Sequence, residues 1–412
     1  MTEFPRHVDG AAVRAITILL LVAAVRQASA QTPDVASGRA ESGRVSVGGE
    51  VSATYGSLDP GFFNYATYAY DPLRNVRVVL DGSARVAPHV ELLGEVRTDG
   101  LSEARVSALY VRVRPWLTRG VDVQAGRVPT AFGLYGRRSY GGDTPFVTRP
   151  LPYAYLLSLR PDARPATADD LVEMRGRGWL SAFPRGVAAP DRGLPIVNTD
   201  TWDTGVQVRL AGQAAEWTAA ITRGTLGRPR LHDDNGGRSF STRAVWRPHP
   251  GLAVGASAAD GAYLSRAVRD TLRAGETLEQ FHQRATGVDV DLSYGRWLLR
   301  SEVLWSRWDL PAFEGEADGR SVSATATWAE ARVRLIPGLD VGLRAERLGF
   351  DRIATPSRET PWEAAVSRLE GGLAFVPVRH VRVTVDVQRN RRPLGGRVRH
   401  DTLLAGQVAV WF

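Results

Sequence analysis

The stretch RVSVGGEVSATY, residues 44–55, alternates between two kinds of side chain. Its odd-numbered positions are apolar or small, and its even-numbered positions are mostly polar. Successive side chains of a β-strand point to opposite faces of the sheet, so this period of two predicts a strand with one apolar and one polar face. The same alternation returns in VRVTVDVQ, residues 381–388, and in LDVGLRAE, residues 339–346.

The apolar faces of these stretches are rich in small residues, and the polar faces carry full charges of both signs. In residues 329–335, Ala329 and Ala331 alternate with Glu330 and Arg332. A soluble two-layer sandwich would need denser packing on its inner faces. In a membrane barrel only every second residue meets lipid, which is compatible with the mean hydropathy of −0.19. The pattern therefore favours an all-β transmembrane barrel.

Short and long connections alternate along the chain after residue 44. The short turns lie near residues 87–89, 114–120, 210–215, 247–251, 294–296, 336–338 and 376–380. The longer connections lie near residues 56–72, 98–104, 127–200, 224–238, 264–280, 309–320, 350–361 and 389–400. Bacterial membrane barrels have short periplasmic turns, longer outer loops and an even number of strands. The alternation predicts an antiparallel barrel of about sixteen strands, and fourteen or eighteen also fit.

The N-terminus has the three parts of an export signal. Arg6 and Arg14 are basic, residues 15–25 form an apolar run, and Ala28-Ser29-Ala30 matches a small-residue cleavage site. The run is too short to span a bilayer as a helix, and an uncleaved anchor helix is the alternative. We expect residues 1–30 to be a signal peptide, residues 31–43 a short periplasmic segment, and residues 44–412 the barrel.

The composition narrows the chemistry of the protein. There is no cysteine, which excludes a disulfide framework and thiolate metal sites. All 52 basic residues are arginine, and the formal net charge is +8. A GC-rich genome explains much of the arginine, and a preference for anionic partners is the functional alternative. No nucleophile elbow, paired-histidine zinc motif or phosphate loop occurs, so we expect no catalytic residue, metal, cofactor or nucleic-acid partner.

Three segments resemble the bacterial outer-membrane porins. Residues 403–412 alternate and end on Phe412, which is similar to the insertion signal read by the barrel-assembly machinery. Residues 126–133, GRVPTAFG, look like the point where many porin chains leave the fifth strand, and residues 330–350 are similar to a late hairpin of phosphate-selective-type porins. The resemblance implies a trimeric outer-membrane channel for passive diffusion of small hydrophilic solutes, with outer-membrane lipid and the assembly machinery as partners.

The longest connection, Arg127 to Asp200, is too long for an ordinary loop of a compact domain. In sixteen-stranded porins the third outer loop folds inward and narrows the pore, so the resemblance assigns this segment as the constriction loop. Ten arginines lie in it, against six acidic residues before Asp200. Arg127, Arg137 and Arg138 are its candidates for the constriction. Alternatively, the loop lies on the surface and its charges are merely solvated.

Charged residues at inward-facing strand positions are the other pore-lining candidates. The basic ones are Arg77, Arg97, Arg112, Arg300, Arg332, Arg334, Arg344 and Arg382. The acidic ones are Glu95, Glu302, Glu330 and Glu346. The selectivity of a pore follows from its diameter and from the charges along it. We expect opposed rows of the two signs across the lumen and, with the basic loop, a weak anion preference; structural pairing inside the barrel is the alternative.

Other functions share parts of this pattern. A barrel plugged by its long loop could serve adhesion, assembly or envelope stability, and a barrel enzyme is a further alternative. A transporter of apolar substrates would need a larger N-terminal plug than residues 31–43 provide. A soluble secreted β-protein is disfavoured by aromatic residues near strand ends, which are typical of interfacial girdles. These are Tyr110, Trp202, Trp246, Tyr294, Trp297, Trp305, Trp328, Trp362 and Trp411.

Overall fold

The computed structural model describes residues 40–42, 44–65, 71–101, 104–116, 119–135, 144–199 and 202–412. The predicted signal peptide, Arg137 and Arg138 lie outside these described residues. Of the predicted periplasmic segment, only the pairing of a short strand, β1 (Ala40–Ser42), with the start of the barrel is described.

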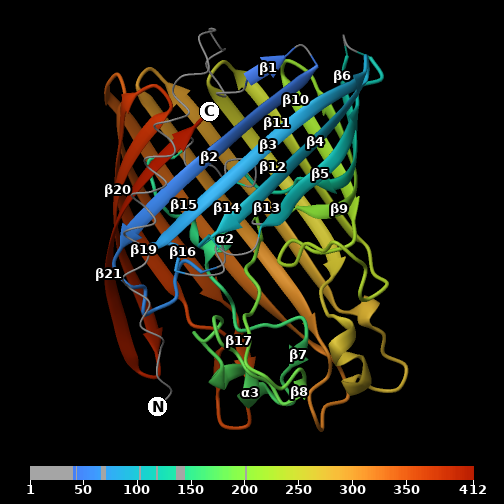
Figure 1. Ribbon diagram of the computed structural model, residues 1–412. Coiled ribbons are helices and arrows are strands. Elements are labelled where there is room, and N and C mark those ends of the chain that lie inside the picture. The colour runs from blue at the N-terminus through green and yellow to red at the C-terminus, as the bar shows by residue number, and fades with distance from the viewer. Residues whose placement is uncertain are drawn as a thin grey trace.

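Sixteen strands form one closed antiparallel barrel (Figure 1). They are β2 (Val45–Gly56), β3 (Asn75–Ala87), β4 (Val90–Asp99), β5 (Arg105–Val113), β6 (Gly120–Val128), β9 (Asp203–Ala211), β10 (Ala215–Thr222), β11 (Ser239–His249), β12 (Leu252–Ala262), β13 (His282–Tyr294), β14 (Trp297–Leu310), β15 (Arg320–Ile336), β16 (Leu339–Phe350), β19 (Val366–Val378), β20 (Val381–Leu394) and β21 (Arg397–Trp411). Consecutive strands pair, and β2 pairs with β21 from Glu50 opposite Trp411 to Gly56 opposite Ala405, which closes the barrel. The prediction of a sixteen-stranded all-β barrel is confirmed.

The strands have one apolar and one polar face, as residues 44–55 predict. Apolar side chains such as Leu80, Val206, Leu343 and Leu373 point outward and stay exposed, whereas charged side chains point into the barrel. Hydrocarbon offers no hydrogen-bond partners, and a closed sheet leaves no unpaired strand edge. The barrel is therefore built to span a membrane.

The short turns lie at one end of the barrel, and most of the longer connections lie at the other end, at the bottom of Figure 1. The longest connection, residues 129–202, follows β6 as predicted. It contains α2 (Leu151–Ala154), β7 (Ala163–Arg164), α3 (Ala168–Glu173) and β8 (Arg185–Gly186). Residues 263–281 contain two 3-10 helices, η2 (Arg266–Thr271) and η3 (Leu278–Gln280). Within the described part of the chain, no helix is both long and apolar enough to cross a bilayer.

One connection differs from its prediction, and another contains additional structure. Residues 389–400 do not form a long loop, because β20 and β21 continue outward and join at Gly395-Gly396. Both glycines have positive φ, and a two-residue hairpin turn with positive φ at both positions favours glycine. The connection between β16 and β19 contains a small hairpin of β17 (Arg352–Ala354) and β18 (Glu359–Pro361).

Seven of the nine aromatic residues predicted to form interfacial girdles divide into an exposed and a buried group, and Trp202 and Trp411 are partly buried. Four of them are exposed on the outer surface: Trp246, Tyr294, Trp297 and Trp305. Tyr110, Trp328 and Trp362 are buried, so the girdle prediction is wrong for these three. Trp328 occupies an inward-facing strand position, where its ring packs against the long loop.

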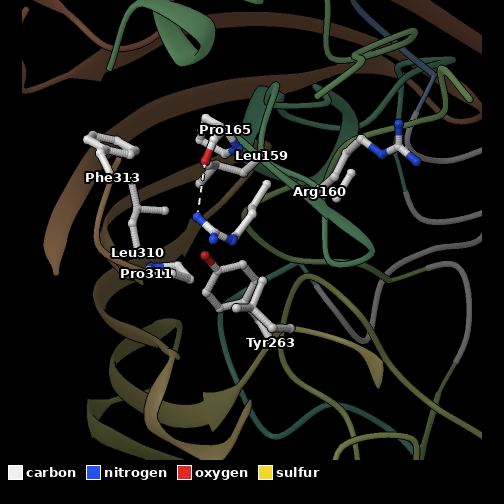
Figure 2. A pocket seen from close by; sticks show the side chains of 10 residues that line it. Leu159, Arg160, Pro165, Tyr263, Leu310, Pro311 and Phe313 are labelled. Atoms are coloured by element: carbon white, nitrogen blue, oxygen red, sulfur yellow. Dashed lines mark hydrogen bonds between the residues drawn. The ribbon is translucent and has the colours of Figure 1, made fainter. Parts of the chain in front are cut away.

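The main apolar core lies in the loop half of the barrel, where connections pack against the strand walls and against one another. Figure 2 shows one meeting point, where Leu159 and Pro165 of the long loop lie near Tyr263, which follows β12, and Phe313, which follows β14. Arg164 donates a hydrogen bond there to the Pro165 carbonyl (3.4 Å). The long loop is thus an integral part of the fold.

Candidate functional site

The long loop, residues 129–202, enters the lumen and binds the inner wall. The backbone N–H of Leu134 donates to Oε1 of Glu302 on β14 (2.7 Å), and the hydroxyl of Tyr153 donates to its Oε2 (2.7 Å). The indole N–H of Trp328 on β15 donates to the same Oε2 (2.8 Å). One buried carboxylate therefore holds two separate points of the loop against the wall.

A second attachment centres on Thr148 of the loop. Its hydroxyl donates to Oε1 of Glu370 on β19 (2.7 Å) and accepts from the side-chain amide of Gln388 on β20 (2.6 Å). The guanidinium of Arg344 on β16 donates to the Thr148 carbonyl (3.0 Å). Three neighbouring strands thus bind one residue of the loop.

Two inward-facing glycines leave room for the loop at this attachment. A Cβ at Gly342 on β16 would lie 2.7 Å from the ring of Phe146, and one at Gly372 on β19 would lie 2.8 Å from the same ring and closer still to the carbonyl oxygen of Pro145. A side chain at either position would displace the loop from the wall. The Arg344 guanidinium lies 4.5 Å from the centroid of the Phe146 ring, a cation–π contact.

Beneath the loop, strand charges form a buried ionic cluster. We call it the loop anchor, and its members are Glu302, Glu330, Arg344, Glu346, Arg368 and Glu370. Arg344 is fully buried; its Nε lies 2.9 Å from Glu346, it also pairs with Glu370, and its Nη1 lies 3.8 Å from Glu330. Arg368 lies 3.7 Å from Glu346. Buried charges are costly unless paired and hydrogen-bonded, so these groups depend on one another and on the loop.

Glu363, in the connection between β16 and β19, binds the outer part of the same loop. Its carboxylate accepts hydrogen bonds from the N–H and the hydroxyl of Ser158 (2.8 and 2.6 Å) and from the N–H of Gly176 (2.5 Å). Burial raises the pKa of Glu363, and these hydrogen bonds, with one from the N–H of Ala364, oppose the rise. Carboxylates therefore hold the loop both within the barrel and at its outer end.

A shorter connection, residues 57–65, closes over the same wall. Arg368 donates to the carbonyls of Phe63 and Arg149 (3.2 Å each), which ties this connection to the long loop. Asp59 accepts hydrogen bonds from the N–H groups of Phe63 and Asn64 (2.8 and 3.1 Å). Burial raises the pKa of Asp59 to about 6, although the positive charge of Arg368 opposes the rise.

Three predicted pore-lining residues lie on β3 and β4. Arg77 and Arg97 share the buried carboxylate of Asp99, at 3.5 and 3.2 Å. Glu95 accepts a hydrogen bond from the hydroxyl of Ser107 on β5. All three face inward as predicted, and each is held by a near neighbour on the wall.

Four more of the predicted arginines, Arg112, Arg332, Arg334 and Arg382, lie toward the turn end of the lumen. Arg112 lies between Glu91 and Asp122, at 3.2 Å from each. Three arginines share the carboxylate of Asp340 on β16: Arg332 (2.6 Å), Arg334 (3.4 Å) and Arg382 (3.8 Å). Here one carboxylate pairs with several arginines, whereas in the loop anchor one arginine, Arg344, pairs with several carboxylates.

Arg300 pairs with neighbours along the wall. Arg300 on β14 lies between Asp291 on β13 (3.5 Å) and Glu330 on β15 (3.7 Å). Directly opposite residues on paired strands are about 5 Å apart, so long side chains reach one another along the wall. At Arg300 the charges therefore pair along the wall, which is the structural alternative, and opposed rows across the lumen stay a prediction.

Arg127 lies on the other face of the barrel from the one expected. Its cross-strand partner on β5 is Leu109, which is exposed on the outer surface. The Arg127 guanidinium donates to the carbonyl of Trp202 (2.9 Å) and to the carbonyl of Val106. Arg127 faces outward because it still belongs to β6, and the inward-folding segment begins only after Val128.

Phe412 lies on the outward face with Leu404 and Val408, as its position predicts. It exchanges two backbone hydrogen bonds with Gly49 (3.0 and 3.2 Å), next to the seam where β21 meets β2. Its role as an insertion signal stays a prediction.

Sequence reasoning missed several residues that hold the loop: Thr148, Glu363, Arg368, Glu370 and Gln388. Arg368 and Glu370 occupy alternate positions of VSRLEGG, residues 366–372, and that alternation could have revealed them. Gln388 lies at a polar position of a clearly predicted strand. Thr148 and Glu363 carry no local signal, since their contacts depend on the paths of two loops.

The described residues contain no group of three or more His, Asp or Glu side chains that could hold a metal ion. The carboxylates of the site accept hydrogen bonds from the loop or pair with arginines. These contacts fix the loop across the lumen and leave arginines at the turn end.

No family model and no curated protein matches the sequence, but solved structures match the fold. OmpT of Vibrio cholerae in its trimer form has a TM-score of 0.51 at 11% identity, over 89% of this chain and 99% of that one. An anion-selective porin from Comamonas acidovorans has a TM-score of 0.53 at 10% identity, over 89% and 98%. OmpF of Salmonella typhi has a TM-score of 0.51 at 10% identity, over 89% and 97%.

At these identities the likeness shows the fold: this is a porin-like β-barrel. The matched structures are bacterial outer-membrane proteins, and the closed barrel has the apolar outer surface that a bilayer requires. We therefore place the chain in a bacterial outer membrane.

Proposed function

We propose that the chain forms a water-filled channel for passive diffusion of small hydrophilic solutes, with a preference for anions. The observation that carries the proposal is the inward fold of residues 129–202, which narrows a sixteen-stranded barrel whose strands turn their charges inward. The anion preference is supported by the net charge of +8 and by the exposed arginines at the turn end of the lumen. Charges along a pore set its selectivity.

On the same proposal, the chain is exported, inserted by the barrel-assembly machinery through a signal ending at Phe412, and assembled as a homotrimer in outer-membrane lipid. The trimer form of the Vibrio cholerae protein supports this assembly. Transport of this kind needs no catalytic residue, metal or cofactor, because solutes cross by diffusion alone.

A second candidate is a structural or adhesion barrel with a plugged lumen. It is favoured by the complete burial of Arg344 and by the apolar core between the loops and the wall in the loop half of the barrel. A plugged barrel keeps the same fold and the same loop contacts and conducts no ions.

Planar-bilayer recordings separate the two candidates. Purified barrels are first shown to be folded by their heat-modifiable migration on detergent gels. The channel predicts discrete conductance steps that grow with salt concentration and a reversal potential on the anion-selective side in a salt gradient. Folded barrels that give no steps would establish the plugged candidate, and a clear cation preference would contradict the proposed selectivity.

A further inference from the structure

The turn end of the lumen holds a set of charges unlike the loop anchor. We call it the turn-side mouth: three carboxylates, Asp122, Glu216 and Asp340, with the arginines that share them. Asp122 lies on β6, Glu216 on β10 and Asp340 on β16, each within a few residues of a short turn.

Each carboxylate of the turn-side mouth is shared by more than one arginine. Asp122 lies 3.2 Å from Arg112 and 3.8 Å from Arg114. Glu216 lies 2.8 Å from Arg209 and 3.2 Å from Arg247. Asp340, as described above, is shared by three. Arginines therefore outnumber carboxylates around Glu216 and Asp340, whereas around Asp122 the two arginines also meet a second carboxylate, Glu91, which pairs with Arg112 (3.2 Å).

The two signs differ in their contact with water. The side chains of Asp122, Glu216 and Asp340 are 9%, 9% and 5% exposed. The outermost arginine of each cluster is far more open, with Arg114 at 49%, Arg247 at 40% and Arg334 at 61%. A solute at these clusters meets the outer guanidinium groups first, while Asp122, Glu216 and Asp340 lie behind them and orient them; Glu91 beside Arg112 is 24% exposed.

The clusters lie on facing walls and at a basic rim. In the order of the barrel, β6 and β16 are eight strands apart of sixteen, so the Asp122 and Asp340 clusters face each other. The turns at this end contain no Asp or Glu; they are residues 88–89, 114–119, 212–214, 250–251, 295–296, 337–338 and 379–380. Facing walls of one sign concentrate ions of the other sign between them.

We propose that the turn-side mouth is a selectivity site for small oxyanions, that is, solutes bearing a phosphate or carboxylate group. This inference rests on the channel proposed above, and it specifies where anions are selected and by which chemistry. Arginine presents a planar fork of N–H donors that matches a phosphate or carboxylate oxygen pair. Buried carboxylates hold these forks in place, so the donors are positioned before an anion arrives.

Measurements of ion selectivity test whether anions are selected at the turn-side mouth. The triple variant Arg114→Gln, Arg247→Gln, Arg334→Gln removes three exposed charges from the mouth. The matched control Arg177→Gln, Arg185→Gln, Arg192→Gln removes three exposed arginines at the loop end. At about 0.1 M salt, where charges act over about 10 Å, we expect the mouth variant to lower the anion-to-cation permeability ratio at least about twofold and the control to leave it nearly unchanged. Equal changes in both variants, or none in the mouth variant, would overturn the proposal.

Chemical footprinting tests binding without requiring conductance. Folded wild-type barrels are treated with phenylglyoxal, with and without inorganic phosphate, and modified arginines are located by mass spectrometry. We expect phosphate to slow modification of Arg114, Arg247 and Arg334 but not of Arg185. Conductance without protection would sink the oxyanion site alone, whereas protection without conductance would sink the proposed channel alone.

Discussion

The loop anchor and the turn-side mouth are built from the same residue types, partly on the same strands. The anchor binds the protein's own loop, whereas the mouth stays open to solutes. On β16, Asp340 of the mouth and Arg344 of the anchor are separated by a single inward-facing position, Gly342. In the anchor two arginines stand among four carboxylates, and in the mouth arginines outnumber carboxylates. The two regions therefore differ in which charge is in excess: carboxylates in the anchor and arginines in the mouth.

That sign decides which partner each region can take. An ionised carboxylate only accepts hydrogen bonds, so the anchor needs donors, and the loop supplies the N–H of Leu134 and the hydroxyls of Thr148 and Tyr153. A guanidinium only donates, so surplus arginines need acceptors, and at the mouth these come from water or from an entering anion. The anchor therefore binds the protein's own chain, and the mouth stays available to solutes.

Arg344→Met should have the largest effect of any substitution that tests this contrast. It removes the arginine that pairs with Glu370 and leaves Glu346 only the more distant Arg368 (3.7 Å), and loss of one partner of a buried pair costs about 3–5 kcal/mol. Thermal unfolding in detergent, followed by the gel shift of heat-modifiable barrels, measures the loss. Arg334→Met on the neighbouring strand is the control and should cost at most about 1 kcal/mol, because that side chain is mostly exposed. Equal losses would remove the distinction between the two regions.

Glu302→Gln should release the loop while keeping the side-chain volume. Glutamine keeps one acceptor oxygen and turns its NH2 group either toward the N–H of Leu134 or toward the donors of Tyr153 and Trp328, which leaves buried polar groups unsatisfied at a cost of about 1–3 kcal/mol. We expect faster proteolysis within residues 129–202 and larger or noisier conductance steps. Glu359→Gln, on the exposed hairpin of β17 and β18, should change neither; a silent Glu302→Gln would show that the loop is held by packing alone.

Gly372→Ala tests the space left for the loop. The added Cβ would press on Pro145 and Phe146, and overpacking of this kind costs about 1–3 kcal/mol. The neighbouring Gly371→Ala is a matched control, because its Cβ would meet no atom within 4 Å. We expect only the Gly372 variant to lower the unfolding temperature and alter conductance. The same behaviour in both would mean that strand propensity, rather than the loop contact, causes the change.

The smallest expected effect is a pH dependence confined to residues 57–65. Because the pKa of Asp59 rises from 3.8 to about 6 in the folded barrel, the folded state binds the extra proton, and this segment loses stability as pH increases from about 4 through about 6. Hydrogen exchange of its amides, corrected for intrinsic rates, should show less protection at pH 8 than at pH 4.5. Asp59→Asn should remove the difference; a segment equally protected at both pH values would contradict the assignment.

Strand number, strand faces and the position of the long loop could all be predicted from residues 44–412. Alternation with period two is a local property of the sequence. Successive residues face lipid and lumen in turn, so apolar and polar side chains follow one another, as in residues 381–388. The turn at Gly395-Gly396 was missed because RNRRPLGGRVRH reads as a polar loop, although its neighbours still pair across the strands.

The roles of the charges could not be read in the same way. The alternation placed Arg344 and Arg334 on one inner face, yet the first is fully buried under the loop and the second is open to water. That difference is set by the path of residues 144–151, in which Thr148 binds Glu370 and Arg344 from 222 and 196 residues away in the chain. The position of a residue in the alternating sequence determines which face of the strand its side chain takes, because successive side chains point to opposite faces. What covers that face depends on contacts between distant segments, which only the closed barrel brings together.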